Sequence, residues 1–98
     1  MREIFHIMKK RYLARLAELG CILCRHFGVE DTPAEIHHLR ARQGLSQRAD
    51  DADAIPLCYE HHRGQSGFHG LGRRAFERRY GVTEDELLAE AKAALNYD

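Results

Sequence analysis

Apolar residues recur at helical spacing near the start of the 98-residue chain, and the stripe stops before Gly20. This pattern predicts an amphipathic helix over residues 1–20, because glycine is a common helix stop. The stripe consists of Ile4, Met8, Tyr12, Leu16 and Leu19. Basic side chains lie largely off it, so we interpret the segment as a packing helix with a solvated face rather than a helix reserved for a partner.

The C-terminal part of the chain predicts further helices. The segment RRAFERRYG, residues 73–81, is typical of a short helix that ends at Gly81. Thr83, followed three positions later by Glu86, forms a capping box and predicts the start of a final helix. The apolar residues expected on the buried side of that helix are Leu87, Leu88, Ala91 and Leu95.

Between these helices the pattern changes to short apolar runs and turns. AEIHHL (residues 34–39) and AIPLC (residues 54–58) each fit a short strand, and the polar run between them predicts a loop. CILCRHFG (21–28) has turn character, YEHHRGQ (59–65) can open a short helix, and GFHGLG (67–72) must bend because it is rich in glycine. The predicted fold class is therefore α+β.

A chain of 98 residues makes one small domain with a limited core, so an additional staple is plausible. It holds no apolar run long enough to span a membrane. The N-terminal segment is charged throughout and carries neither the apolar region nor the cleavage site of a signal peptide. The sequence thus predicts a cytoplasmic protein with no membrane association.

Acidic and basic residues balance, with 15 of each, but their distribution is uneven. From Arg40 to Arg79 every basic residue other than histidine is an arginine, and arginine suits bidentate contact with phosphate. Two interpretations stay open for this cluster, a solvated salt-bridged face and a phosphate-binding surface. Its members are Arg40, Arg42, Arg48, Arg63, Arg73, Arg74, Arg78 and Arg79.

Three cysteines cannot all pair in disulfides, and seven histidines are a large excess for so short a chain. Cys21 and Cys24 form a C-x2-C pair, and Cys58 and His61 form a C-x2-H pair. Two such pairs, separated by a longer loop, have the spacing of a closed Cys3His zinc site, which is typical of structural zinc. The alternatives are three inert buried cysteines, and His26 in place of one ligand.

Four other histidines suggest a second centre. His37 and His38 are adjacent on the first predicted strand, and His62 directly follows the zinc ligand His61. Successive helical residues are offset by about 100°, so His61 can face the zinc while His62 faces the strand. A lone histidine is usually structural, but two adjacent pairs around one loop favour a common site that includes His69.

The pattern C-x2-C, HH, D-x4-C-x2-HH resembles the HNH nuclease motif of the ββα-metal fold, over roughly residues 21–70. In the zinc-knuckle branch of that family, the equivalent of His37 is a metal ligand and that of His38 is the general base. His62 takes the helix metal-ligand place, and Asp53 stands where the family has asparagine. His61 stands where the family often has a fourth cysteine.

The resemblance is greatest to the phage recombination-enhancement (Ref-like) nucleases, through HHL, PLCYEHHRG, the trailing histidine and F-x3-YG. It implies a single HNH domain over residues 1–98, with an N-terminal helix (1–20), a zinc knuckle and ββα-metal core (21–70) and C-terminal helices (71–98). It also implies a protein of a bacterial host cell, encoded by a phage or prophage. A recombination or phage protein is an expected partner, whose identity the sequence leaves open.

The implied activity is metal-dependent hydrolysis of DNA phosphodiesters, by nicking and with low sequence specificity. Mg²⁺ or Mn²⁺ would be the catalytic ion on His37 and His62, with structural Zn²⁺ at the knuckle. His69 is a third ligand, a phosphate contact or a surface histidine in a glycine-rich loop, and Asp53 is one candidate for orienting His38. The residues expected to bind DNA are Arg40, Arg42, Arg63, Arg73 and Arg74.

Two other functions are compatible with the same residues. One is a zinc-stapled nucleic-acid-binding module that has lost catalysis, and the other is a structural zinc protein that acts on a protein partner. A binding module needs the zinc knuckle but not His37, His38 and His62 together. The structural protein predicts no salt-sensitive affinity for DNA.

Overall fold

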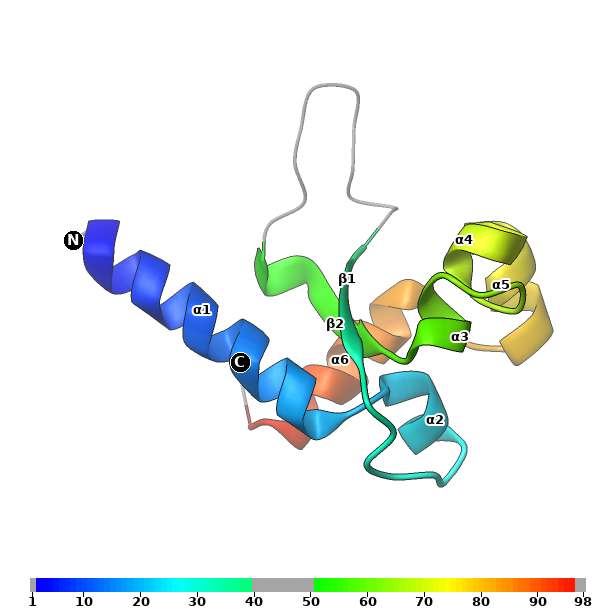
Figure 1. Ribbon diagram of the computed structural model, residues 1–98, viewed down its shortest axis with the longest axis horizontal. Coiled ribbons are helices and arrows are strands. Elements are labelled where there is room, and N and C mark those ends of the chain that lie inside the picture. The colour runs from blue at the N-terminus through cyan, green and yellow to red at the C-terminus, as the bar shows by residue number, and fades with distance from the viewer. Residues whose placement is uncertain (1, 40–50, 97–98) are drawn as a thin grey trace.

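A computed structural model describes residues 2–39 and 51–96 of the chain. Two short strands lie at the centre, with the helices arranged around them (Figure 1). The elements are α1 (Arg2–Leu19), α2 (Ile22–His26), β1 (Glu35–His38), a 3₁₀ turn (Asp51–Asp53), β2 (Ala54–Leu57), α3 (Tyr59–His62), α4 (Phe68–Leu71), α5 (Arg73–Tyr80) and α6 (Glu84–Ala94). The predicted α+β class is confirmed.

The strands β1 and β2 pair antiparallel, so the two predicted strands form one sheet. His37 lies opposite Ile55, and His38 lies opposite Ala54. Pro56 fits this sheet because, with two strands in the described part of the chain, each strand has one edge that needs no backbone donor. The register places Glu35, opposite Leu57, next to the turn that leads into α3, and His38 at the other end of the sheet, where β2 begins.

The predicted helix ends are also present. Gly20 follows α1 with φ +84°, a conformation that side chains other than glycine rarely adopt. Gly81 ends α5 in the left-handed region at φ +68°. At the start of α6, Thr83 Oγ1 accepts from the Glu86 N–H at 3.0 Å, and Glu86 Oε1 accepts from the Thr83 N–H at 2.9 Å. The capping box is therefore confirmed.

Two segments differ from the prediction, because α2 and α4 are one-turn helices where a turn and a bend were expected. In α2, the Cys21 sulfur caps the helix by accepting from the Cys24 N–H at 3.5 Å. In α4, Phe68 is fully buried and its ring stacks on Phe76 with centroids 3.7 Å apart. Tertiary packing thus outweighs the low helix propensity of the glycine-rich segment.

One hydrophobic core joins the sheet to the helices around it. Tyr12 and Leu16 of α1 are buried in it, as the stripe predicts, whereas the side chains of Ile4 and Met8 fall outside the described part. The other fully buried members include Ile22, Leu23, Leu39, Ile55, Leu57, Phe76 and Leu87. None of the helices within the described ranges is long and apolar enough to cross a membrane.

Gly67 lies where two backbone segments come close together, just before α4. A Cβ atom there would lie 2.4 Å from the carbonyl oxygen of Glu60 and 2.6 Å from that of His61. We expect Gly67→Ala to lower the free energy of unfolding by about 3 kcal/mol, because backbone of α3 must shift. Urea unfolding followed by circular dichroism would measure this loss.

Gly64 provides the matched control for that substitution. The three atoms nearest to its Cβ would all belong to the Glu60 carboxylate, 2.6 Å away, and that side chain can move. Gly64→Ala should therefore cost about 1 kcal/mol, roughly the value of the hydrogen bonds that Glu60 loses. Equal losses in the two variants would contradict the close approach at Gly67.

Candidate metal centres

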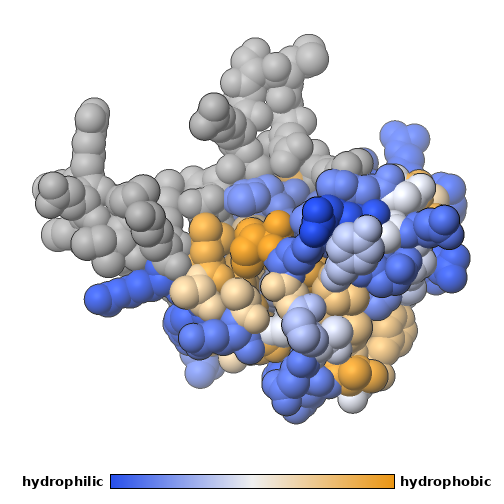
Figure 2. Space-filling model, in the orientation of Figure 1, coloured by the Kyte–Doolittle hydropathy of each residue, from blue (hydrophilic) through white to orange (hydrophobic). Residues whose placement is uncertain are grey.

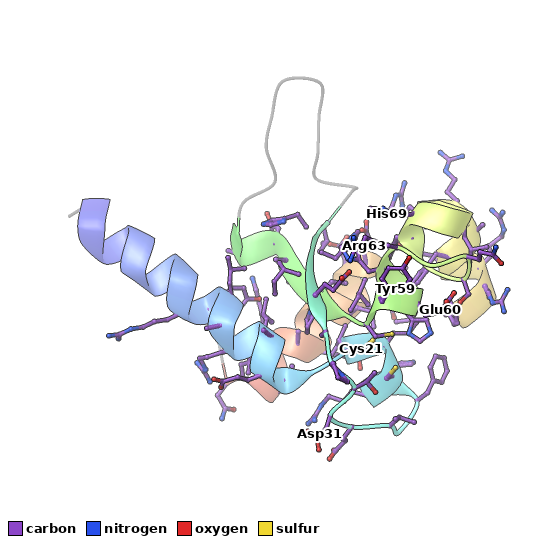
Figure 3. The ribbon with its side chains drawn as sticks, viewed as in Figure 1. Cys21, Asp31, Tyr59, Glu60, Arg63 and His69 are labelled. Atoms are coloured by element: carbon purple, nitrogen blue, oxygen red, sulfur yellow. The ribbon has the colours of Figure 1, made fainter. Side chains whose placement is uncertain are left out.

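The four residues of the predicted zinc knuckle come together from two parts of the chain. Cys21 and Cys24 lie at the start of α2, while Cys58 and His61 lie at the junction of β2 and α3. One ligand atom from each of these residues lies within 4.8 Å of the others. Figure 3 shows Cys21 at the side of α3 that faces α2. The structure therefore brings together a complete Cys3His donor set.

The distances within this group fit a shared metal ion. His61 Nδ1 lies 3.2 Å from the Cys58 sulfur and 3.7 Å from the sulfurs of Cys21 and Cys24. Tetrahedral Zn²⁺, with Zn–S of about 2.3 Å and Zn–N of about 2.0 Å, sets nitrogen and sulfur about 3.6 Å apart. One imidazole nitrogen can accept only one S–H hydrogen bond, so hydrogen bonding does not account for three sulfurs around it.

Burial affects the protonation of these candidate ligands. It raises the pKa of the Cys21 thiol to about 12, because a thiolate is poorly solvated there. A cation on the same sulfur would stabilise the thiolate and release the proton. Burial also lowers the pKa of His61 below its ordinary value, which keeps the ring in the neutral form that binds metals.

His26, the predicted substitute ligand, has a different partner. Its Nδ1 lies 2.8 Å from Oε2 of Glu90 on α6, at the surface. The group around the sulfurs consists of the three cysteines and His61. Within the described residues, the structure thus favours His61 over His26 as the fourth member.

A second group gathers three of the remaining histidines. His37 from β1, His62 from α3 and His69 from α4 each place a ring nitrogen within 4.8 Å of the others. The rings of His37 and His62 have centroids 5.1 Å apart, and those of His62 and His69 4.8 Å apart. The adjacent residues His61 and His62 thus serve two different groups, as the helical offset predicts.

His37 is the most enclosed of the three. Its side chain is 3% exposed, and its Nε2 lies 2.8 Å from Oε2 of Glu84, which is 1% exposed. The ring stacks on Phe68 with centroids 4.5 Å apart and planes 13° apart. A carboxylate at one edge and an aromatic ring at one face therefore hold the imidazole in a single orientation.

His62 is held in a similar way, by a carboxylate at the start of β1. Its Nδ1 lies 2.9 Å from Oε1 of Glu35, and Arg63 donates to both oxygens of the same carboxylate. Hydrogen bonds from Arg63 and, next, from His62 lower the pKa of Glu35, so it is ionised at neutral pH. Burial lowers the pKa of His62, more than its bond to Glu35 raises it. His62 is therefore a neutral imidazole at pH 7.

The loop between α3 and α4 positions His69. Glu60 Oε2 accepts from the backbone N–H of Ser66 at 2.9 Å and from its hydroxyl at 2.6 Å. The hydroxyl of Tyr80 donates to the Ser66 carbonyl at 2.7 Å. These bonds fix the loop that leads from His62 to His69, although His69 itself is exposed.

His38 and Asp53 lie on neighbouring strand ends. Within the described residues, the second group contains His37 but not His38, which is half-buried. This fits β geometry, in which successive side chains point to opposite faces. Asp53 comes directly before Ala54, the residue opposite His38, and its carbonyl accepts from the Leu39 N–H at 2.9 Å. That carbonyl is therefore used in the main-chain ladder.

The predicted DNA-binding arginines have different surroundings. Arg40 and Arg42 lie outside the described residues. Arg63 is paired with Glu35 and lies 5.0 Å above the ring of the exposed Tyr59. Arg73 donates to Glu77 at 3.3 Å, and Arg74 is exposed. Figure 3 shows Arg63 and His69 on the same side of the molecule, and Figure 2 shows mostly hydrophilic side chains over α4 and α5.

The sequence pattern does not indicate two residues of this centre, Glu35 and Glu84. They lie 27 and 47 positions from the histidines that they contact, so no local spacing links them. Glu84 belongs to an acidic run that predicts only a helix start. The one usable signal is Glu35, a charged residue at the beginning of an otherwise apolar strand pattern.

Comparison with known proteins identifies the family to which the chain belongs. No curated protein matches the chain. A family model described as recombination enhancement, RecA-dependent nuclease, matches residues 7–96, which is nearly the whole chain and includes both groups of side chains that could hold a metal ion. The resemblance to Ref-like nucleases is thereby confirmed, and the chain belongs to the family of recombination-enhancement, RecA-dependent nucleases.

Proposed function

We propose that this chain is a metal-dependent endonuclease of HNH type, which hydrolyses DNA phosphodiesters during recombination. The observation that carries the proposal is the meeting of His37, His62 and His69 beside a separate Cys3His group. Membership of a nuclease family supplies the substrate class, nucleic acid. We propose that the enzyme nicks DNA, because one such centre attacks one strand. We also propose that its sequence specificity is low.

The second group fits a divalent cation by its donor chemistry. It offers three imidazole nitrogens within 4.8 Å of one another, and two of the rings are fixed by carboxylates. Imidazole binds first-row transition metals better than Mg²⁺, which prefers oxygen. We therefore propose His37 and His62 as ligands, His69 as the third, and Mn²⁺ as a tighter ion than Mg²⁺.

The cation would stabilise the negative charge that develops on the phosphate and on the leaving oxygen. His38, the last residue of β1, would accept a proton from the attacking water, a role that histidine often has in catalysis. The water oxygen forms a bond to phosphorus, the bond from phosphorus to the 3′-oxygen breaks, and that oxygen takes a proton from solvent. We propose Asp53 as the group that orients His38.

Arginines around this centre would bind the DNA substrate. Arg63 lies next to His62 in the chain, and Arg74 is exposed on α5. We propose that Arg40, Arg42, Arg63, Arg73 and Arg74 bind phosphates on either side of the cleaved bond, with an affinity that falls as salt rises. Part of the charge of Arg63 is already neutralised by Glu35, so its contribution should be smaller than that of Arg74.

The Cys3His group would hold structural Zn²⁺, since all four positions are filled by protein. It links the start of α2 to the junction of β2 and α3, which carries His62. We propose that the sheet, α3 and this zinc form the ββα-metal core, and that residues 1–98 act as one domain. A family partner such as RecA would deliver or prepare the DNA.

The test is cleavage of supercoiled plasmid by the zinc-loaded protein. We expect nicked circles with Mn²⁺, fewer with the same concentration of Mg²⁺, and none with EDTA. Parallel reactions with and without RecA filaments on single-stranded DNA would measure the dependence that the family description states. Gel electrophoresis at increasing salt would report loss of cleavage as phosphate contacts weaken.

The other functions give different results in the same reactions. Salt-sensitive DNA binding without cleavage, with every metal and with RecA, would favour the zinc-stapled binding module. Absence of both binding and cleavage would favour a structural zinc protein with a protein partner. Cleavage that is unaffected by EDTA would contradict the metal-dependent mechanism.

A further inference from the structure

Glu84 is a buried acidic residue that has no role in the reaction proposed above. Its side chain is 1% exposed and lies against a histidine that is 3% exposed. Burying a carboxylate is costly unless it is paired, so its place in the interior is tied to His37. Glu84 is also the first residue of α6, where the positive end of the helix dipole favours a negative charge.

The contact with Glu84 occupies one ring nitrogen of His37. Nε2 lies 2.8 Å from Glu84 Oε2, and stacking on Phe68 holds the ring plane. With Glu84 as the acceptor in this contact, Nε2 carries the hydrogen and the lone pair lies on Nδ1. A metal ion would then be bound through Nδ1.

His62 shows the same arrangement with the nitrogens exchanged. Nδ1 lies 2.9 Å from Glu35 Oε1, which leaves the lone pair on Nε2. Arg63 holds this carboxylate from the other side. His37 and His62 therefore each keep one nitrogen for a carboxylate partner and one for a cation.

We propose that Glu84 and Glu35 are positioning residues that fix complementary tautomers of His37 and His62 for metal binding. The proposal rests on the nuclease site proposed above and extends it to α6, outside the segment 21–70 that carries the HNH motif. A carboxylate on the far nitrogen also makes an imidazole a stronger ligand. Glu84 thereby makes the C-terminal helix part of the metal centre.

The first test needs no variant. Two-bond ¹H–¹⁵N correlation spectra of the zinc-loaded protein, labelled at histidine, distinguish the two tautomers of each ring. We expect the hydrogen on Nε2 of His37 and on Nδ1 of His62. A hydrogen on Nδ1 of His37 would overturn the assignment.

The second test measures Mn²⁺ affinity by calorimetry on the zinc-loaded protein. We expect Glu84→Gln and Glu35→Gln each to weaken Mn²⁺ binding by about 10- to 100-fold, as carboxylates behind metal-binding histidines do elsewhere. Glu90→Gln is the matched control, because Glu90 lies on the same helix and also pairs with a histidine, His26, away from the centre. Its Mn²⁺ affinity should equal that of the wild type.

The results separate this proposal from the nuclease proposal. Wild-type Mn²⁺ affinity in Glu84→Gln, or absence of Mn²⁺ binding by the wild type, overturns the positioning role. Mn²⁺ binding with the expected tautomers but without DNA cleavage contradicts only the nuclease mechanism. Zinc content, measured in every variant, shows whether the fold is retained.

Discussion

Replacing Cys58 by serine is expected to remove the zinc ion and to lower the free energy of unfolding by about 4 kcal/mol or more. In small zinc domains, metal binding supplies about 10–16 kcal/mol of apparent free energy to folding. Cys58 joins β2 to α3, and its sulfur lies closest to His61 Nδ1, at 3.2 Å. Thermal unfolding by circular dichroism and zinc analysis of the purified variant would measure both losses.

The pH dependence of zinc retention follows from the same ligands. The sulfurs must be thiolates to bind zinc, and burial raises the pKa of the Cys21 thiol to about 12. Protons therefore compete for the site, and the competition strengthens as the pH falls. Zinc should be released on acidification, with the unfolding midpoint falling in the same pH range.

The control for Cys58→Ser is Val29→Ala, close to the same knuckle. Val29 is 56% exposed, so its truncation should change stability by less than about 0.5 kcal/mol. A Cys58→Ser variant that keeps one zinc per chain and the midpoint of the wild type would exclude Cys58 as a ligand.

The second large effect is expected on catalysis. His38→Ala should reduce plasmid nicking by about 10²- to 10⁴-fold, the usual contribution of a general base. Zinc content and Mn²⁺ affinity should not change, because the group that would hold Mn²⁺ contains His37, His62 and His69. Single-turnover cleavage at saturating Mn²⁺ would separate loss of chemistry from loss of metal.

Two further variants identify the cause of the loss. His62→Ala should lose Mn²⁺ affinity as well as cleavage, because it removes a proposed ligand. His26→Ala, in which a surface histidine paired with Glu90 is removed, should cleave like the wild type. Undiminished nicking by His38→Ala would show that another group accepts the proton from water.

Local patterns predicted much of this fold. Gly20, Gly81 and the capping box at Thr83 act within one helical turn, so sequence alone identifies them. The same is true of each C-x2-C or C-x2-H pair, because a single turn sets the distance between its members. What these patterns could not give is α4, whose helical form depends on burial of Phe68 against Phe76.

The carboxylates of the second centre could not be predicted from local patterns. Glu84 sits in an acidic run that is ordinary for a helix start, and only the packing of α6 brings it to His37. The ion pair between Arg63 and Glu35 joins residues 28 positions apart and was likewise not predicted. Both facts depend on contacts between distant segments, which composition and spacing do not encode.

The shortness of α3 has a consequence for how this chain can vary. His61 and His62 are consecutive, yet one faces the sulfurs and the other faces His37. A single residue inserted between Cys58 and His61 would turn both rings by about 100° and withdraw them from their groups together. Substitutions at the exposed Tyr59 would leave both rings in place. The length of the segment from Cys58 to His62, in contrast, cannot change without moving them.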